Sequence, residues 1–161
     1  AMGRHAEAAL PTLRSLPSDR PEYAQPVLEA LEAIGEPAVP TLVDLAADPN
    51  VGDRAIEALA ALGPPGIEAL GRIVRSGSSD DARRGAIRAL GGCGAGAASQ
   101  VPILVECVES GPHAIQDASL ESLAELGPVA REAAPARRRP AGTVSPWLRG
   151  RIEETLARID G

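Results

Sequence analysis

The chain has 161 residues and a formal net charge of −6, and all 16 of its basic residues are arginines. Apolar residues make up 44% of it, but phenylalanine is absent, and Tyr23 and Trp147 are its aromatic residues. No apolar run approaches the roughly 20 residues of a transmembrane helix, the N-terminus has no secretory signal pattern, and two cysteines make no disulfide framework. We therefore expect a cytoplasmic domain with a core of Leu, Ile, Val and Ala in closely packed helices. Ala1 before Met2 is typical of a residue left by tag removal.

A first set of short apolar segments predicts the first helix of a repeated unit. These segments are LPTL (10–13), VPTL (39–42), IEAL (67–70) and VPIL (101–104). Three of them carry a proline in the expected first turn, where its missing N–H costs no hydrogen bond: Pro11, Pro40 and Pro102. Breaker residues follow each segment, and three of the polar ones are predicted N-caps of the next helix: Asp48, Ser79 and Ser145.

A second set of segments shares a longer apolar stripe and predicts the second helix of the unit. Its central leucines are 28, 31, 33 and 33 residues apart: Leu31, Leu59, Leu90, Leu123 and Leu156. Apolar residues recur at helical spacing around each leucine, beginning eight residues before it with Tyr23, Val51, Ala82, Ile115 and Leu148. In four copies a glycine follows at the position of a helix C-cap: Gly35, Gly63, Gly94 and Gly127.

The two sets alternate and predict a helical hairpin of about 30 residues that occurs about five times. A single hairpin cannot bury its own stripe, so the copies must stack into a solenoid. We expect one domain over 1–161, with repeats over 5–35, 36–63, 64–94, 95–127 and 128–161.

The segments DDARRGAIRALG (80–91) and DRAIEALAALG (53–63) resemble the second helix of a HEAT repeat, in the short bacterial form named after phycobilisome lyases. The resemblance covers nearly the whole chain. It implies an all-α, right-handed superhelix, with first helices on the convex face and second helices on the concave face. It does not imply one activity, because the family includes scaffolds, adaptors, chromophore lyases and relatives of DNA glycosylases.

The fifth copy departs from the pattern, since a weak alanine-rich stripe runs into Arg137, Arg138 and Arg139. This segment is either a solvated loop of a terminal capping pair or a basic loop that binds an acidic or phosphorylated partner. Trp147 either seals the C-terminal cap or anchors a partner or a second copy of the chain.

Residues for catalysis or metal binding are sparse. His5 and His113 have no Cys or His at a ligand spacing, so no metal site is expected. Cys93 and Cys107 fall on the core stripes and are interpreted as small buried thiols, the alternative being a redox pair or an attachment site. The glycine-rich run 91–96 follows a helix and lacks the Lys-Ser/Thr ending of a phosphate loop. We therefore predict a protein that is not an enzyme and has no cofactor.

The charge balance argues against nucleic acid and membrane surfaces as partners. The isoelectric point is about 5.0, whereas a phosphate-tracking domain is typically above about 9. The arginines at 83, 84 and 88 are offset by Asp80 and Asp81 within one helical turn. No predicted helix combines a basic face with bulky apolar residues.

These observations predict a non-catalytic scaffold or adaptor that binds an unidentified protein or peptide on the concave face of the second helices. The candidate contact residues are Arg54, Arg84, Arg88, Asp117, Glu121, Arg137, Arg138, Arg139 and Trp147. Two other functions stay open: handling of a chromophore or small molecule, as in phycobilisome-lyase relatives, and DNA binding or repair. End-to-end self-association also stays open.

Overall fold

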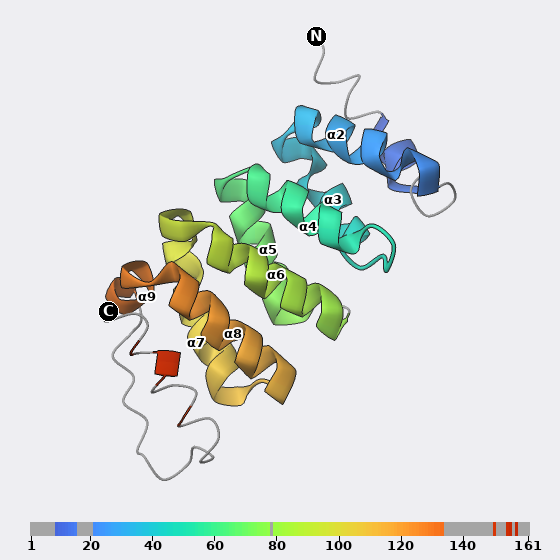
Figure 1. Ribbon diagram of the computed structural model, residues 1–161. Coiled ribbons are helices and arrows are strands. Elements are labelled where there is room, and N and C mark those ends of the chain that lie inside the picture. Colours follow the sequence, from blue (N-terminus) through green and yellow to red (C-terminus); the bar gives the residue numbers. More distant parts are fainter. Residues whose placement is uncertain are drawn as a thin grey trace.

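The structure is a computed structural model, and it describes residues 9–15, 21–77, 79–133, 150, 154–155 and 157. Every regular element in this part of the chain is a helix (Figure 1). After a helix over residues 9–15, the elements are η1 (Pro21–Tyr23), α2 (Ala24–Ile34), η2 (Glu36–Ala38), α3 (Val39–Leu45), α4 (Gly52–Ala61), α5 (Pro64–Ser76), α6 (Asp80–Gly92), η3 (Gly94–Gln100), α7 (Val101–Ser110), α8 (His113–Leu126) and α9 (Pro128–Ala133), where η marks a 3-10 helix. The prediction of an all-α fold is confirmed.

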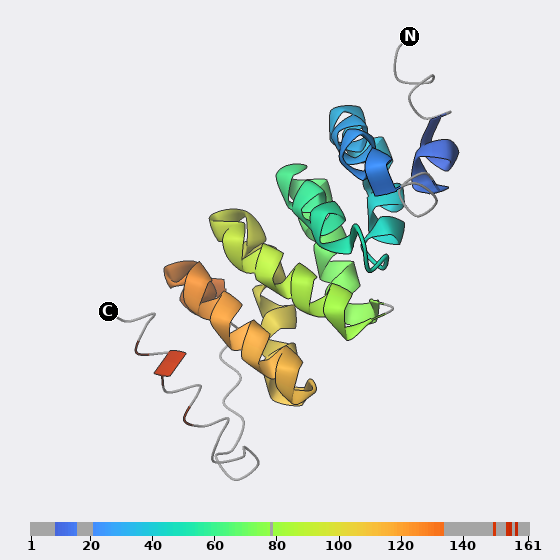
Figure 2. The same ribbon diagram turned by 45° about the vertical axis from the view of Figure 1, so that its right-hand side comes forward.

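The α-helices stack as hairpins in two layers (Figures 1 and 2). The predicted second helices α2, α4, α6 and α8 lie side by side in one layer, and the predicted first helices α3, α5 and α7 form the other. Helix α6 lies in the middle of the stack and contacts α4, α5 and α8. Among the described helices, none has the length and apolar character needed to cross a bilayer.

The core consists of the apolar stripes that the repeat predicts. Leu31, Leu59 and Leu90 have no exposed surface, and Leu123 is buried as well. Three of the residues eight positions earlier are also buried: Val51, Ala82 and Ile115. Tyr23 is the exception, with 43% of its surface exposed, because it lies in η1 before α2 begins. Its assignment to the core was wrong.

Four glycines end the second helices as predicted. Gly35, Gly63, Gly94 and Gly127 have φ values of 79°, 69°, 54° and 54°, in the left-handed region that side chains other than glycine rarely adopt. After Gly35 and Cys93 the chain passes through the 3-10 helices η2 and η3 into the next first helix. The glycine-rich run 91–96 thus joins two helices, which differs from the strand-to-helix turn of a phosphate loop.

Side chains close the turns inside the hairpins. Ser79 caps α6 as predicted, since its Oγ accepts a hydrogen bond from the N–H of Ala82 at 3.1 Å. Asp48 does not cap α4, whose N-cap residue is Val51; its Oδ1 accepts from the N–H of Asn50 at 2.8 Å, a local turn that competes with the cap. Ser145 lies outside the described residues.

Two further side chains cap the carboxyl ends of first helices. The Nε of Arg83 donates to the carbonyl oxygen of Val74 at the end of α5 at 3.1 Å. The Nε2 of Gln116 donates to the carbonyl oxygen of Val108 at the end of α7 at 3.0 Å. Both donors lie seven residues before the central leucine of their helix. Two successive repeats therefore use the same position to cap the carbonyl oxygens at the end of the preceding first helix.

Candidate partner-binding surface

Two positions on each second helix form a row of polar residues across the stack, which we call the charge ladder. The positions are four residues apart, so they lie one turn apart on the same side of a helix. The ladder consists of Gln25 and Glu29 on α2, Asp53 and Glu57 on α4, Arg84 and Arg88 on α6, and Asp117 and Glu121 on α8. Six of these eight residues are exposed, and Arg84 and Asp117 are half-buried. The sign of the charge therefore reverses at α6 and reverses again at α8.

The opposite charges of the ladder do not pair with one another. Arg84 forms an ion pair with Asp81, one turn earlier on its own helix. Arg88, Glu57 and Glu121 take part in no ion pair or side-chain hydrogen bond within the part of the chain that the structure describes. These exposed charges are therefore available to a partner molecule.

A cavity of about 380 Å³ opens beside the ladder, between the turn that precedes α4 and the first half of α6. Its charged lining residues are Asp48, Asp53, Asp81, Arg84 and Arg88. Two glycines lie in its wall: Gly52 is packed against backbone atoms of the preceding turn, and Gly85 faces side-chain atoms of α4. A Cβ on Gly85 would lie 2.8 Å from Cδ1 of Ile56, and one on Gly52 would lie 2.7 Å from the carbonyl oxygen of Ala46. We call this space the α4–α6 cavity.

Arg84 is held in an incompletely satisfied state at the wall of this cavity. Its Nη2 contacts Oδ1 of Asp81, whereas its Nε is enclosed by protein and has no hydrogen-bond partner. The side chain as a whole is still 37% exposed. A buried donor without an acceptor costs about 1–3 kcal/mol. Because this Nε is enclosed, only the exposed part of the guanidinium is accessible to a ligand.

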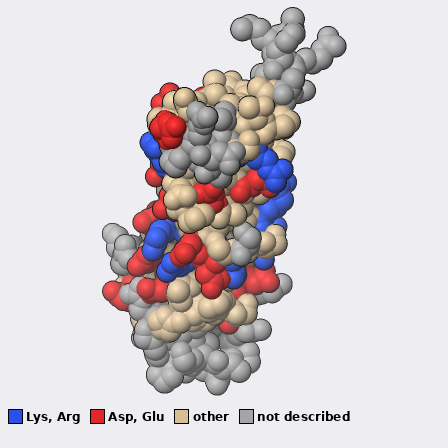
Figure 3. Space-filling view, turned by 90° about the vertical axis from the view of Figure 1, so that its right-hand side faces the viewer, with Lys and Arg blue, Asp and Glu red and all other residues tan. Residues whose placement is uncertain are grey.

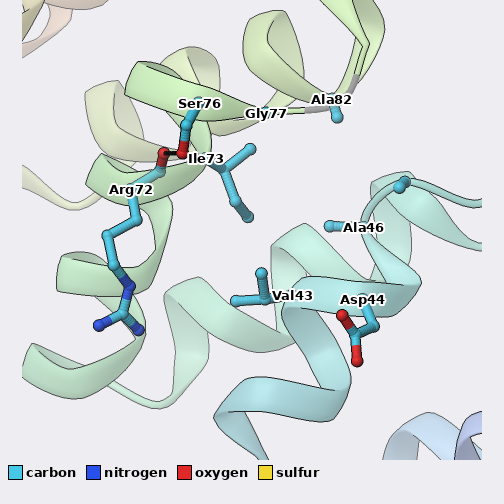
Figure 4. A pocket seen from close by; sticks show the side chains of 9 residues that line it. Val43, Asp44, Ala46, Arg72, Ile73, Ser76, Gly77 and Ala82 are labelled. Atoms are coloured by element: carbon cyan, nitrogen blue, oxygen red, sulfur yellow. Dashed lines mark hydrogen bonds between the residues drawn. The ribbon is translucent and has the colours of Figure 1, made fainter.

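Two other cavities lie in the layer of first helices. One of about 370 Å³ separates α3 from α5; Figure 4 shows Val43, Ala46 and Ile73 pointing into it, and Arg72 and Asp44 on opposite sides. Asp44 pairs with Nε of Arg14 at 3.2 Å. The other, of about 580 Å³, lies between the ends of α5 and α7. Apolar groups dominate the first, so its chemistry differs from that of the α4–α6 cavity.

Both cysteines are free thiols in the structure. Cys107 is buried and lines the cavity between α5 and α7, while Cys93 is half-buried and its Sγ lies 3.1 Å from the carbonyl oxygen of Ala89. Burial raises the pKa of both thiols; for Cys107 the positive charge of Arg83 offsets part of the effect. A raised pKa lowers the thiolate fraction at neutral pH, which agrees with unreactive, structural thiols.

The structure brings five of the predicted contact residues onto one layer. Arg54 lies on α4, Arg84 and Arg88 lie on α6, and Asp117 and Glu121 lie on α8. Arg137, Arg138, Arg139 and Trp147 lie outside the described residues, so the two interpretations of that segment stay predictions. No cluster of three or more His, Cys, Asp or Glu side chains suited to a metal ion occurs among the residues described.

Sequence reasoning missed the α4–α6 cavity. The signal was present in the alignment of DRAIE (53–57) with RGAIR (84–88), where Gly85 stands in the place of Arg54 and both ladder charges are reversed. A long side chain at this position in α4 and no side chain in α6 together predict an unfilled space between the two helices.

Figure 3 shows the side on which the second helices begin. Acidic and basic side chains are interleaved across its middle, and neither sign forms an extended patch there. Such a pattern suits recognition of a surface with its own alternating charges better than the tracking of a phosphate backbone.

Comparisons with known proteins find a similar fold. No family model matches the chain, and no curated protein matches it. A chain in the structure of the complex of CpcE and CpcF of phycocyanin lyase, from a Nostoc species, aligns with a TM-score of 0.56 and 22% sequence identity. The alignment covers 92% of this chain and 98% of the other.

This comparison corrects one prediction. The absence of a recognisable catalytic set led us to expect a protein that is not an enzyme, yet the matching structure is that of a lyase complex. Stacked hairpins of this kind therefore give no ground for excluding catalysis. The comparison also confirms the resemblance drawn from the repeats: over most of its length the chain has the HEAT-like, all-helical fold found in a phycocyanin lyase complex.

Proposed function

We propose that the chain binds a partner protein through the charge ladder, with Arg84 and Arg88 on α6 as the central contact. The observation that carries the proposal is the unpaired arginine at 88 between two helices that carry acids at the same positions. A charge without an intramolecular partner can bind a partner protein without breaking a contact of the fold, and the alternation of signs selects for a complementary sequence of charges.

The expected partner surface follows from this alternation. It presents acidic groups opposite α6 and basic groups opposite α4 and α8. Arginine is suited to the central position, because its planar guanidinium binds a carboxylate through two parallel hydrogen bonds. That the matching solved structure is a complex of two proteins supports a role in assembly.

The test compares two double charge reversals in an affinity capture from the source cells. In the first variant Arg84 and Arg88 are changed to Glu. In the control, Arg72 and Arg75 on α5, both exposed in the other layer, are changed to Glu, which alters the net charge by the same amount. We expect partners that bind the wild type and the control but are lost from the first variant.

Candidate partners are then purified and titrated calorimetrically against the three proteins. A loss of at least about tenfold in affinity confined to the α6 variant supports the proposal, since truncating a central charged contact typically costs 2 kcal/mol or more, roughly thirtyfold. Equal binding of all three proteins would refute it.

A second candidate function is the handling of a chromophore or other small molecule, favoured by the fold likeness to a phycocyanin lyase complex and by the cavities between the hairpins. Visible absorbance of the purified protein, together with native and denaturing mass spectra, tests for a retained ligand. A mass that equals that of the polypeptide in both spectra, with no visible absorbance, argues against it. The cytoplasmic location and the expectation that nucleic acid is not the partner stay predictions, and end-to-end association stays open.

A further inference from the structure

The α4–α6 cavity holds unpaired charges of both signs on facing walls. Asp53 is exposed on α4, Arg88 is exposed on α6, and both line the cavity. They form no ion pair with each other. An unpaired carboxylate and an unpaired guanidinium across one open space are the two halves of a site for a molecule with both charges.

The other charged groups of the lining are already engaged, in part or in full. Asp48 accepts the N–H of Asn50 through its Oδ1, and Asp81 pairs with Arg84. Arg84 lines the cavity with a side chain that is 37% exposed, although its Nε is enclosed and has no partner. The two guanidinium groups that line the cavity belong to Arg84 and Arg88, one turn apart on α6.

The balance of the lining excludes a simple anion as the best ligand. Three carboxylates, those of Asp48, Asp53 and Asp81, stand against two guanidinium groups. An isolated anion would gain from the arginines but would be repelled by Asp53. A ligand that brings its own cation turns this repulsion into a second attraction.

From this arrangement we propose that the α4–α6 cavity binds a zwitterionic group, in which one molecule carries a carboxylate and an ammonium or guanidinium. Arg84 and Arg88 hold the carboxylate, and Asp53 holds the cation. The source of this chemistry is either a free zwitterion or a polypeptide segment with neighbouring acidic and basic side chains. This proposal extends the proposed function and rests on it, because it uses the same two arginines.

The size of the cavity and its glycines support this assignment. A volume of about 380 Å³ accommodates a small zwitterion or two neighbouring side chains. A Cβ at Gly85 would lie in van der Waals contact with Oδ1 of Asp53, at 3.6 Å, so the glycine keeps the space beside this carboxylate open. In α4 the equivalent position carries Arg54, which is exposed and is not part of the cavity lining.

The test is a titration of the full chain with four probes, followed through the Nε–Hε signals of its arginines in ¹⁵N NMR spectra. The probes are acetate, ethylammonium, γ-aminobutyrate and a capped peptide with adjacent Glu and Lys. We expect γ-aminobutyrate or the peptide to shift the Arg84 and Arg88 signals and to bind at least about tenfold more tightly than acetate or ethylammonium, because the second charge is held at high effective concentration. The tighter of these two probes identifies the source.

Three single variants assign the charges. Arg88→Gln and Asp53→Asn should each weaken binding of the better probe at least about fivefold, while Glu68→Gln, an exposed carboxylate on α5 outside the lining, should leave it unchanged. Circular dichroism confirms that each variant is folded. Acetate binding as tightly as the joined probes, no saturation by any probe, or an equal loss in Glu68→Gln would each overturn the proposal.

These outcomes separate the inference from the proposed function. If the probes fail while partner capture still depends on Arg84 and Arg88, the ladder binds a partner without using the cavity. If the probes bind as expected and no partner depends on the arginines, the cavity is a small-ligand site in its own right.

Discussion

Helix α6 meets its two neighbours in the second-helix layer in different ways. Against α8 the contact is closed: a Cβ on Gly91 would lie 3.0 Å from Cα of Ser122, and Oγ of Ser122 donates to the carbonyl oxygen of Ile87 at 2.8 Å. Against α4 the glycine is Gly85, which faces the flexible end of Ile56, and the α4–α6 cavity remains open beside it.

The leucine stripe is the same on both sides of α6, so it does not explain this difference. Small residues explain it. A glycine that faces backbone atoms lets two helices approach until a serine hydroxyl can reach the neighbouring main chain. A glycine that faces the end of an isoleucine side chain leaves space between the two helices at the surface, and charged residues line that space. Two equivalent junctions of the repeat thus differ: α6 and α8 are closely packed, whereas α4 and α6 leave a cavity between them.

Leu90→Ala should cause the largest loss of stability among the variants, because this side chain is fully buried and lies on the helix that takes part in both junctions. We expect a loss of about 3 kcal/mol or more in the free energy of unfolding, from lost burial and the cavity that remains. Urea unfolding followed by circular dichroism measures it. A loss below about 1 kcal/mol would show that the stack collapses around the missing side chain.

Gly91→Ala tests the closed junction. The added methyl lies 3.0 Å from Cα and 3.1 Å from Cβ of Ser122, so α6 and α8 must separate by a few tenths of an ångström. Its nearest atom is Oε2 of Glu125, at 2.5 Å, which belongs to a flexible side chain that can move away. The cost of overpacking, about 1–3 kcal/mol, should exceed the gain in helix propensity, with a net loss of about 1 kcal/mol. The same unfolding experiment applies. A more stable variant would show that α6 and α8 have room for the methyl group.

Ser122→Ala removes the hydroxyl that joins α8 to the main chain of α6. A buried hydrogen bond of this kind contributes about 1 kcal/mol net, so we expect a loss of that size or slightly less. Combined with Gly91→Ala in a double-mutant cycle, the two changes should not be additive, because the first already separates the helices. Strict additivity would contradict a shared contact.

Gly85→Ala should have the smallest effect of the four. Its methyl meets only Cδ1 of Ile56, at 2.8 Å, and side-chain Oδ1 of Asp53, so a rotamer change relieves the contact. The gain in helix propensity, up to about 1 kcal/mol, offsets that adjustment, and we expect a change within about 0.5 kcal/mol. A loss as large as that of Gly91→Ala would remove the distinction between the two junctions.

The sequence by itself determined the helices and their order. Leucines at a regular interval, stripes at helical spacing and glycines at helix ends are local signals, and the buried Leu31, Leu59 and Leu90 and the positive φ of Gly35 and Gly63 confirm them. They also placed Arg84, Arg88 and Glu121 on one layer, because residues four apart share a helical face and copies of a repeat align. Tyr23 and Asp48 were misplaced where a 3-10 helix or a local turn replaced the expected helix start.

Only the tertiary structure decided which charges stay unpaired and where the stack opens. Whether Arg84 turns to Asp81 on its own helix or to an acid on α4 depends on the distance between helices, which the repeat pattern does not contain. That distance is set at each junction by what a glycine faces: backbone of Ser122 on one side of α6, the tip of Ile56 on the other. The repeat therefore specifies the stack, and non-repeated contacts between copies specify the surface and cavity that a partner can use.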